Sequence, residues 1–203
     1  MIAMTPKQFR NLSCAVIVTF LLVVVEPVSA HEAAGSIGGF KSGFVHPILG
    51  WDHVVAMVAV GLWGAFLGAP AIWMLPVVFP LVMAAGGALG VAGVNLPAVE
   101  IGIAVSAIVL GGMVAAALRP PLWVAVAIVG AFAVFHGHAH GTELPQAADP
   151  LAYSAGFVLA TGLLHLAGIG VGNLVRWPAG RIIVRAAGMV IAAVGAAFLA
   201  GVA

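Results

Sequence analysis

The residues best suited to chemistry in this sequence are histidines that stand within apolar segments. Residues 44–53, FVHPILGWDH, contain His46, Asp52 and His53. On a continuous helix, positions four and seven apart share a face, so His46, Gly50 and His53 are expected to form one stripe. Asp52 lies about 100° around the helix from His53. It is therefore expected to reach the site from the flank, or to orient a histidine of another helix.

A second stretch, FHGHAHGTE at residues 135–143, has a similar composition in the other half of the chain. His136, His140 and Glu143 fall on one helix face, whereas His138 points away if the helix continues through it. Imidazole and carboxylate donors in two such groups are typical of sites for zinc, copper, iron, cobalt or nickel. Histidine must be neutral to bind a metal, so the affinity is expected to fall below about pH 6.

Three isolated residues complete the set of candidate metal ligands, and each also has a simpler interpretation. Glu100 suits a metal ligand, and it suits equally well a buried carboxylate at the start of a helix that binds no metal. His165 shares a helix face with Thr161 and, as a lone histidine in a membrane segment, suits a hydrogen bond between helices. If the signal is cleaved after Ala30, His31 carries the free terminal amine, and the amine and imidazole together can bind nickel or copper. The simpler interpretation is that His31 is part of a disordered chain terminus without a role in metal binding.

The composition indicates a membrane protein. Of 203 residues, 64% are hydrophobic and 6% are charged, whereas soluble domains carry about 25% charged residues. The chain has 7 Lys and Arg and 6 Asp and Glu, so it has no basic patch, and binding to nucleic acid is not expected. The single cysteine, Cys14, excludes a disulfide framework and a thiolate metal cluster.

Residues 1–30 have the parts of a secretory signal peptide. Lys7 and Arg10 give the positive start, and the apolar run over 12–25 is too short to span a bilayer. Small residues then lead to a cleavage site after Ala30. We expect the signal to be removed there, and an uncleaved membrane anchor is the alternative.

Residues 31–203 are expected to form one domain, an all-α polytopic membrane bundle of six transmembrane helices. Each apolar segment has about the 20 residues that a span requires, and prolines and an asparagine stand between the segments. Pro47 favours the first turn of a helix, which places His46 at the very start of the first one. The six segments are about 44–68, 70–94, 97–118, 121–140, 150–174 and 180–202.

The charges predict how this bundle is oriented in the inner membrane of a bacterium. A cleaved signal leaves the mature N-terminus in the periplasm, and six spans return the C-terminus to the same side. Both histidine stretches and Glu100 then lie near the periplasmic side, and His165 lies deeper, as an inward path for a cation requires. The arginines fall at cytoplasmic helix ends, in agreement with the positive-inside rule. They are Arg119, Arg176, Arg181 and Arg185.

These motifs resemble the HupE/UreJ family of membrane proteins. The likeness rests on HPILGWDH at 46–53, LPAVE at 96–100, FHGHAHGTELP at 135–145 and YSAGFVLATGLLH at 153–165. It covers nearly all of the chain after the signal. The resemblance implies a secondary permease for nickel or cobalt that is associated with hydrogenase and urease accessory operons.

The resemblance also implies which residues handle the metal. A broader family of nickel and cobalt transporters has the hallmark His-x4-Asp-His, and this chain departs from it, because five residues separate His46 from Asp52. The coordination therefore need not be the same in the two families. The residues implied are His46, Asp52 and His53 in the first helix, and His136, His140 and Glu143 in the fourth.

The function that these features predict is import of Ni2+ or Co2+ across the inner membrane, without enzymatic activity or an organic cofactor. The chain has no Walker A motif, so ATP hydrolysis is not expected. The expected partners are the divalent metal ion, the lipid bilayer and hydrogenase or urease maturation proteins. The main alternative is a membrane-embedded metallochaperone or metal sensor for such maturation, which binds metal without transport. Transport of zinc or copper, and a metalloenzyme that activates water, are further alternatives.

Overall fold

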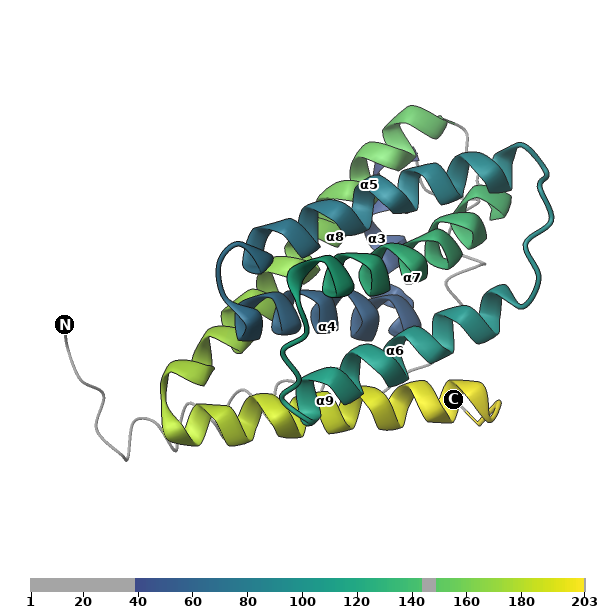
Figure 1. The fold of residues 1–203 in the computed structure, drawn as a ribbon. Coiled ribbons are helices and arrows are strands. Elements are labelled where there is room, and N and C mark those ends of the chain that lie inside the picture. The colour runs from purple at the N-terminus through teal and green to yellow at the C-terminus, as the bar shows by residue number, and fades with distance from the viewer. Residues whose placement is uncertain (1–38, 144–148, 203) are drawn as a thin grey trace.

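The computed structural model describes residues 39–143 and 149–202, which form helices and their connections, with no strand among them. The expected all-α class is therefore confirmed for this part of the chain. The expected signal peptide and His31 lie outside the described residues. The elements are α3 (Gly39–Leu49), α4 (Trp51–Leu67), α5 (Ala71–Val91), α6 (Val99–Ala115), α7 (Leu122–Glu143), α8 (Pro150–Gly172), the short 3-10 helix η2 (Asn173–Arg176) and α9 (Pro178–Leu199) (Figure 1).

All six apolar segments are helical, but they differ in length. Four helices of the described chain are long and apolar enough to cross a membrane, namely α5, α7, α8 with η2, and α9. A fifth span is present if the bent pair α3 and α4 is taken as one. Helix α6 is apolar but has only 17 residues, slightly fewer than a perpendicular span needs.

The first segment is not one continuous helix, so the expected single stripe of His46, Gly50 and His53 is wrong. Helices α3 and α4 meet at an angle of 77°, and Gly50 between them has extended backbone at φ −79° and ψ 106°. Pro47 lies near the end of α3 rather than at its start. The physical reason is packing: α3 and α4 both pack on α8, and the bend brings α4 into the middle of the bundle, where it also contacts α5, α6 and α9.

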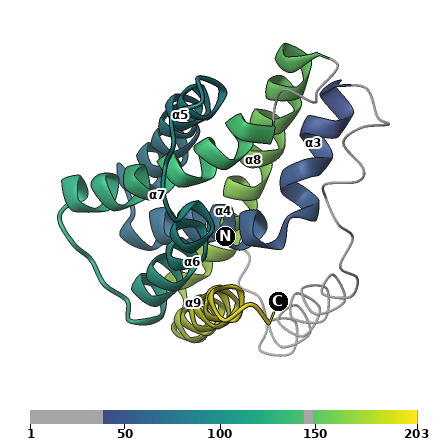
Figure 2. The same ribbon diagram turned by 90° about the vertical axis from the view of Figure 1, so that its right-hand side faces the viewer.

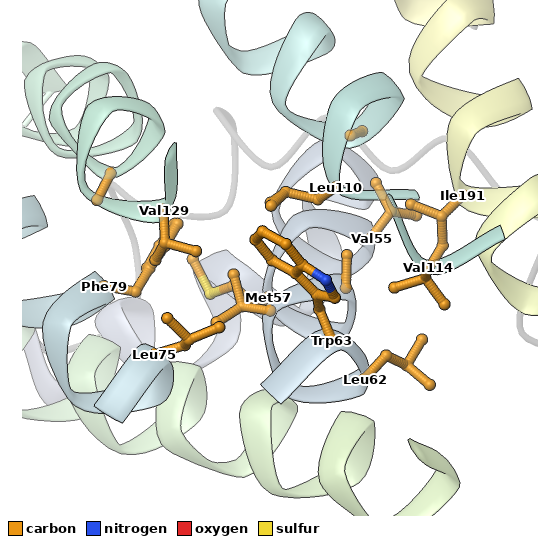
Figure 3. Close-up of a cluster of buried hydrophobic side chains, with 14 of the residues drawn as sticks. Val55, Met57, Leu62, Trp63, Leu75, Phe79, Leu110, Val114, Val129 and Ile191 are labelled. Atoms are coloured by element: carbon orange, nitrogen blue, oxygen red, sulfur yellow. The ribbon is translucent and has the colours of Figure 1, made fainter. Parts of the chain in front are cut away.

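Helix α4 is the central element of the bundle. It contacts α3, α5, α6, α8 and α9, and in Figures 1 and 2 it lies in the middle of the other helices. Twelve of its 17 residues are buried. Trp63 of α4 is fully buried, with Leu75 and Phe79 on one side and Val114 and Ile191 on the other (Figure 3). A central helix of this kind can hold a side chain at a fixed depth within the membrane.

Glycines let the outer helices approach α4 and one another closely, as small residues do in membranes. In the pair α5 and α7, a Cβ atom on Gly137 would collide with the carbonyl oxygen of Met83. In the pair α6 and α9, a Cβ atom on Gly111 would lie 2.7 Å from the carbonyl oxygen of Gly188. These contacts join backbone to backbone, so the helix spacing cannot relax by a change of rotamer.

The arginines lie at the end of the bundle where α6 and α8 finish. Arg119 stands over the ring of Phe66 at 4.7 Å from its centroid. Arg185 donates from Nε to the carbonyl oxygen of Ala115, the last residue of α6, at 2.7 Å. Basic side chains thus satisfy carbonyl groups that helix ends leave free. Helix α7 begins just after Arg119, so its last turn with His140 lies at the opposite end of the bundle, where the ring of His46 on α3 meets that of His140.

Candidate metal centre

Three histidines from three helices converge at that other end. His46 comes from the last turn of α3, His53 from the first turn of α4 and His140 from the last turn of α7. One ring nitrogen of each lies within 4.8 Å of the others, and all three side chains are buried. The ring centroids of His46 and His53 are 5.0 and 4.4 Å from that of His140. We call this group the histidine trio.

The shortest contact in the trio joins two nitrogens that both face its centre. Nε2 of His53 lies 2.6 Å from Nε2 of His140. Two lone pairs repel at this distance, so a proton or a cation must lie between them. A first-row metal with bonds of about 2.0–2.1 Å needs its ligand nitrogens about 3–4 Å apart. A rotation that separates the two rings by about 1 Å would therefore admit an ion.

Three carboxylates surround the trio. They share with it a cavity of about 80 Å³, which exceeds the space that one water needs and suits a partly hydrated ion. Oε2 of Glu143 lies 3.5 Å from Nε2 of His46 and 3.9 Å from Nδ1 of His140. None of the lining residues is lysine or arginine, so around neutral histidines the three carboxylates make the cavity favour a cation. The lining residues are His46, Gly50, Asp52, His53, Glu100, Ile103, Ala139, His140 and Glu143.

Asp52 contacts the neighbouring His53, within the first turn of α4. Its Oδ1 lies 2.7 Å from Nδ1 of His53, a distance at which the two groups interact directly. The sequence left two roles open for Asp52, contact with the site from its flank or orientation of a histidine on another helix; the structure places it in the cavity lining, against His53 of its own helix. The carboxylate favours a proton on Nδ1 of His53, which leaves Nε2 of that ring free to bind a metal.

We expect Asp52→Asn to weaken metal binding by about 10–100-fold, the usual cost of removing a carboxylate beside a metal-binding histidine. The substitution keeps the shape of the side chain and removes its charge, so the fold should be unaffected. Equilibrium dialysis of the purified protein against Ni2+ or Co2+ measures the change. Unaltered affinity with an unaltered unfolding temperature would contradict this role of Asp52.

His136 lies one helical turn deeper than His140 and outside the trio. Its ring centroid is 5.5 Å from that of His53, and its side chain is fully buried. Its Nε2 lies 3.0 Å from Oγ of Ser106 on α6. The structure thus brings His136 next to the site, but its hydrogen bond to Ser106 occupies one ring nitrogen.

The other candidate metal ligands differ in their distance from the cavity. Glu100 is exposed in the first turn of α6 and lines the cavity. His165 is buried on α8, away from the cavity lining. His138 points away from the trio, as expected, and its Nε2 lies at hydrogen-bonding distance, 2.7 Å, from the carbonyl oxygen of Val94. His138 therefore ties α7 to the connection between α5 and α6.

Sequence reasoning missed three residues that shape the site. Tyr153 and Phe157 of α8 cover the trio: the ring of Phe157 lies 4.3 Å from that of His140, and the ring of Tyr153 lies 6.1 Å from that of His46. Their spacing of four residues was a usable signal, because it places both on one helix face. Ser106 was also detectable, since it is the only hydroxyl residue in the apolar segment 97–118.

Comparison with known proteins identifies the family of the chain. The family model described as HupE / UreJ protein matches residues 19–198, which include every residue of the cavity. The chain belongs to the HupE/UreJ family. Among its HupE/UreJ relatives is a protein of Rhizobium leguminosarum bv. viciae described as "Protein HupE", which is 45% identical over 186 residues. The alignment covers 91% of this chain and 97% of that protein. No solved structure matches the chain.

Proposed function

We propose that this HupE/UreJ protein is a permease that imports Ni2+ or Co2+ across the bacterial inner membrane. The observation that carries the proposal is the convergence of His46, His53 and His140 beside three carboxylates in a bundle of apolar helices. Ionisable groups are costly in a membrane and usually mark an ion or substrate path. The absence of a Walker A motif supports a secondary transporter.

The proposed topology has six spans and places both ends of the mature chain in the periplasm. The bent pair α3 and α4 would form the first span, and the short helix α6 the third. Cleavage after Ala30 would start the mature chain outside. The position of Arg119 and Arg185 at the end of the bundle opposite the trio supports this orientation, because basic residues favour the cytoplasmic side. The trio would then receive metal from the periplasm.

The choice of nickel or cobalt rests on membership of the HupE/UreJ family together with the donor set. Nitrogen and oxygen ligands suit several divalent metals, and affinity alone does not separate them. We propose hydrogenase or urease maturation as the use of the metal. Metal preference is measurable by competition: uptake of radioactive nickel is expected to fall with excess cobalt and to resist the same excess of zinc.

Reconstitution in liposomes tests transport directly. Purified protein in sealed vesicles is expected to admit Ni2+ or Co2+, detected by a metal-sensitive dye inside, above the leak of empty vesicles. A membrane metallochaperone or sensor, the alternative function, would bind the ion at the trio without raising the internal signal. Tight binding by equilibrium dialysis combined with no flux would therefore overturn the permease and favour the alternative.

A further inference from the structure

Two polar side chains on α8 lie in the interior with no hydrogen-bond partner among residues 39–143 and 149–202. His165 and Thr161 are 1% and 0% exposed. Both ring nitrogens of His165 and the hydroxyl oxygen of Thr161 lack a hydrogen-bond partner in the described part of the chain. The two residues are four apart on one helix, so their side chains share a face. Burial of such groups is unfavourable unless a ligand or water satisfies them.

This pair lies deeper in the bundle than the histidine trio. Phe157, which covers His140, is eight residues earlier on α8, so His165 lies about 12 Å further along the helix axis. Backbone packing fixes the depth of α8 here, because a Cβ atom on Gly61 of α4 would collide with the carbonyl oxygen of His165. The same contact places His165 beside the central helix.

A row of aromatic rings connects the trio with this pair. The ring of His136 lies 5.5 Å from that of His53 and 5.5 Å from that of Phe79. The ring of Phe79, in turn, lies 5.6 Å from that of His165. Phe79 is fully buried on α5 (Figure 3). It therefore separates two imidazoles that are placed at successive depths.

Ser106 determines which nitrogen of His136 is free along this row. The hydroxyl of Ser106 donates to the carbonyl oxygen of Ile103, and the two oxygens are 2.6 Å apart. At this distance the hydroxyl proton must lie between them, because two oxygen lone pairs would otherwise repel. Its oxygen must then accept the Nε2 proton of His136. Nδ1 of His136 consequently carries a lone pair, and it has no partner within the described residues.

We propose that His165 and Thr161 form a second binding station, deeper in the bundle, for the divalent cation that the trio captures. This inference rests on the proposed transport function. An imidazole nitrogen and a hydroxyl oxygen provide two ligands, and water completes the shell. No carboxylate belongs to the pair, so the station binds the cation more weakly than the trio does. Weak binding lets the ion leave the station toward the cytoplasm. Nδ1 of His136 offers one ligand between the two sites.

The stoichiometry of cobalt binding tests the station independently of transport. Equilibrium dialysis with excess Co2+ is expected to give two ions per wild-type chain and one ion for His165→Asn. Thr161→Val, a substitution of nearly the same shape, should weaken the second ion about 10-fold. Ser154→Ala removes an exposed hydroxyl from the same helix and should keep both ions. One ion in the wild type, or two ions in His165→Asn, would overturn the station.

The kinetics of uptake separate the station from the trio. His165→Asn and Thr161→Val are expected to lower the maximal rate about 10-fold and to leave KM for the ion within about 2-fold, because KM is set by entry at the trio. A variant with wild-type maximal rate and two bound ions would show that water alone fills the pair. If the wild type binds two ions but carries none, the permease fails and the station stands. Unfolding temperatures of all variants identify any that lose the fold.

Discussion

Replacing His53 by alanine is expected to lower metal uptake by at least about 100-fold, since loss of an outer partner alone costs about 10–100-fold. His53 contacts both other histidines of the trio as well as Asp52. Its Nε2 faces His140 at 2.6 Å and its Nδ1 faces Asp52 at 2.7 Å. Without its ring, the site keeps the imidazoles of His46 and His140 and the carboxylate of Glu143, and it loses the nitrogen ligand that faces His140. Uptake of radioactive nickel by cells that express each protein measures the loss.

His138→Gln is the matched control for this experiment. It removes a buried imidazole from the same end of α7, but that ring faces the carbonyl oxygen of Val94 instead of the trio. Glutamine can still donate a hydrogen bond there, so this variant should retain uptake. Equal uptake by His53→Ala and His138→Gln, at equal protein levels, would exclude the trio as the site of entry.

The second large effect is expected from Gly137→Ala, although it adds only one methyl group. This Cβ would collide with the backbone of Met83 on α5, which a change of rotamer cannot relieve. Overpacking typically costs about 1–3 kcal/mol, and we expect the upper end of this range. Gly137 is three residues before His140 on α7, so separation of α5 from α7 also displaces this member of the trio. Thermal unfolding in detergent and metal content after purification measure the two effects.

Gly130→Ala on the same helix serves as the control. A Cβ atom there would meet only Cγ2 of Val82, at 3.9 Å, which is an ordinary contact. This variant should match the wild type or exceed it slightly, because alanine favours the helix by about 1 kcal/mol over glycine. If both variants unfold at the same temperature, close contact between α5 and α7 does not limit stability.

Composition and segment lengths were sufficient to predict the helices, because long apolar runs have few other stable forms in a membrane. They were not sufficient to predict the break at Gly50. In a segment that is apolar on all sides, no periodic pattern indicates where the helix turns. Gly39 and Gly43 contain a signal that was not used, since this spacing of small residues favours close packing of a helix on its neighbour. A Cβ on Gly43 would indeed collide with the backbone of Tyr153 on α8.

Residue types also indicated most members of the candidate site. Helical spacing within single segments did not indicate which of them lie together. His46 and His53 meet because the chain bends, and not because they share a helix face. His140 lies beside them, as expected. His136 instead forms a hydrogen bond with Ser106, and this contact between α6 and α7 is visible only in the packed bundle. Distances between segments are set by long-range packing, and spacing along one segment carries no information about them.

The bend at Gly50 also gives the site a contribution from the backbone. Peptide dipoles add along a helix, so the carboxyl end of α3 carries about half a negative charge. That end lies at the cavity, since His46 in its last turn and Gly50 just beyond it both line the space. The opposite pole, at the start of α4, is offset by the carboxylate of Asp52 in its first turn. An uninterrupted helix would offer an incoming cation side chains alone, whereas the broken one adds the electronegative pole of its own peptide groups.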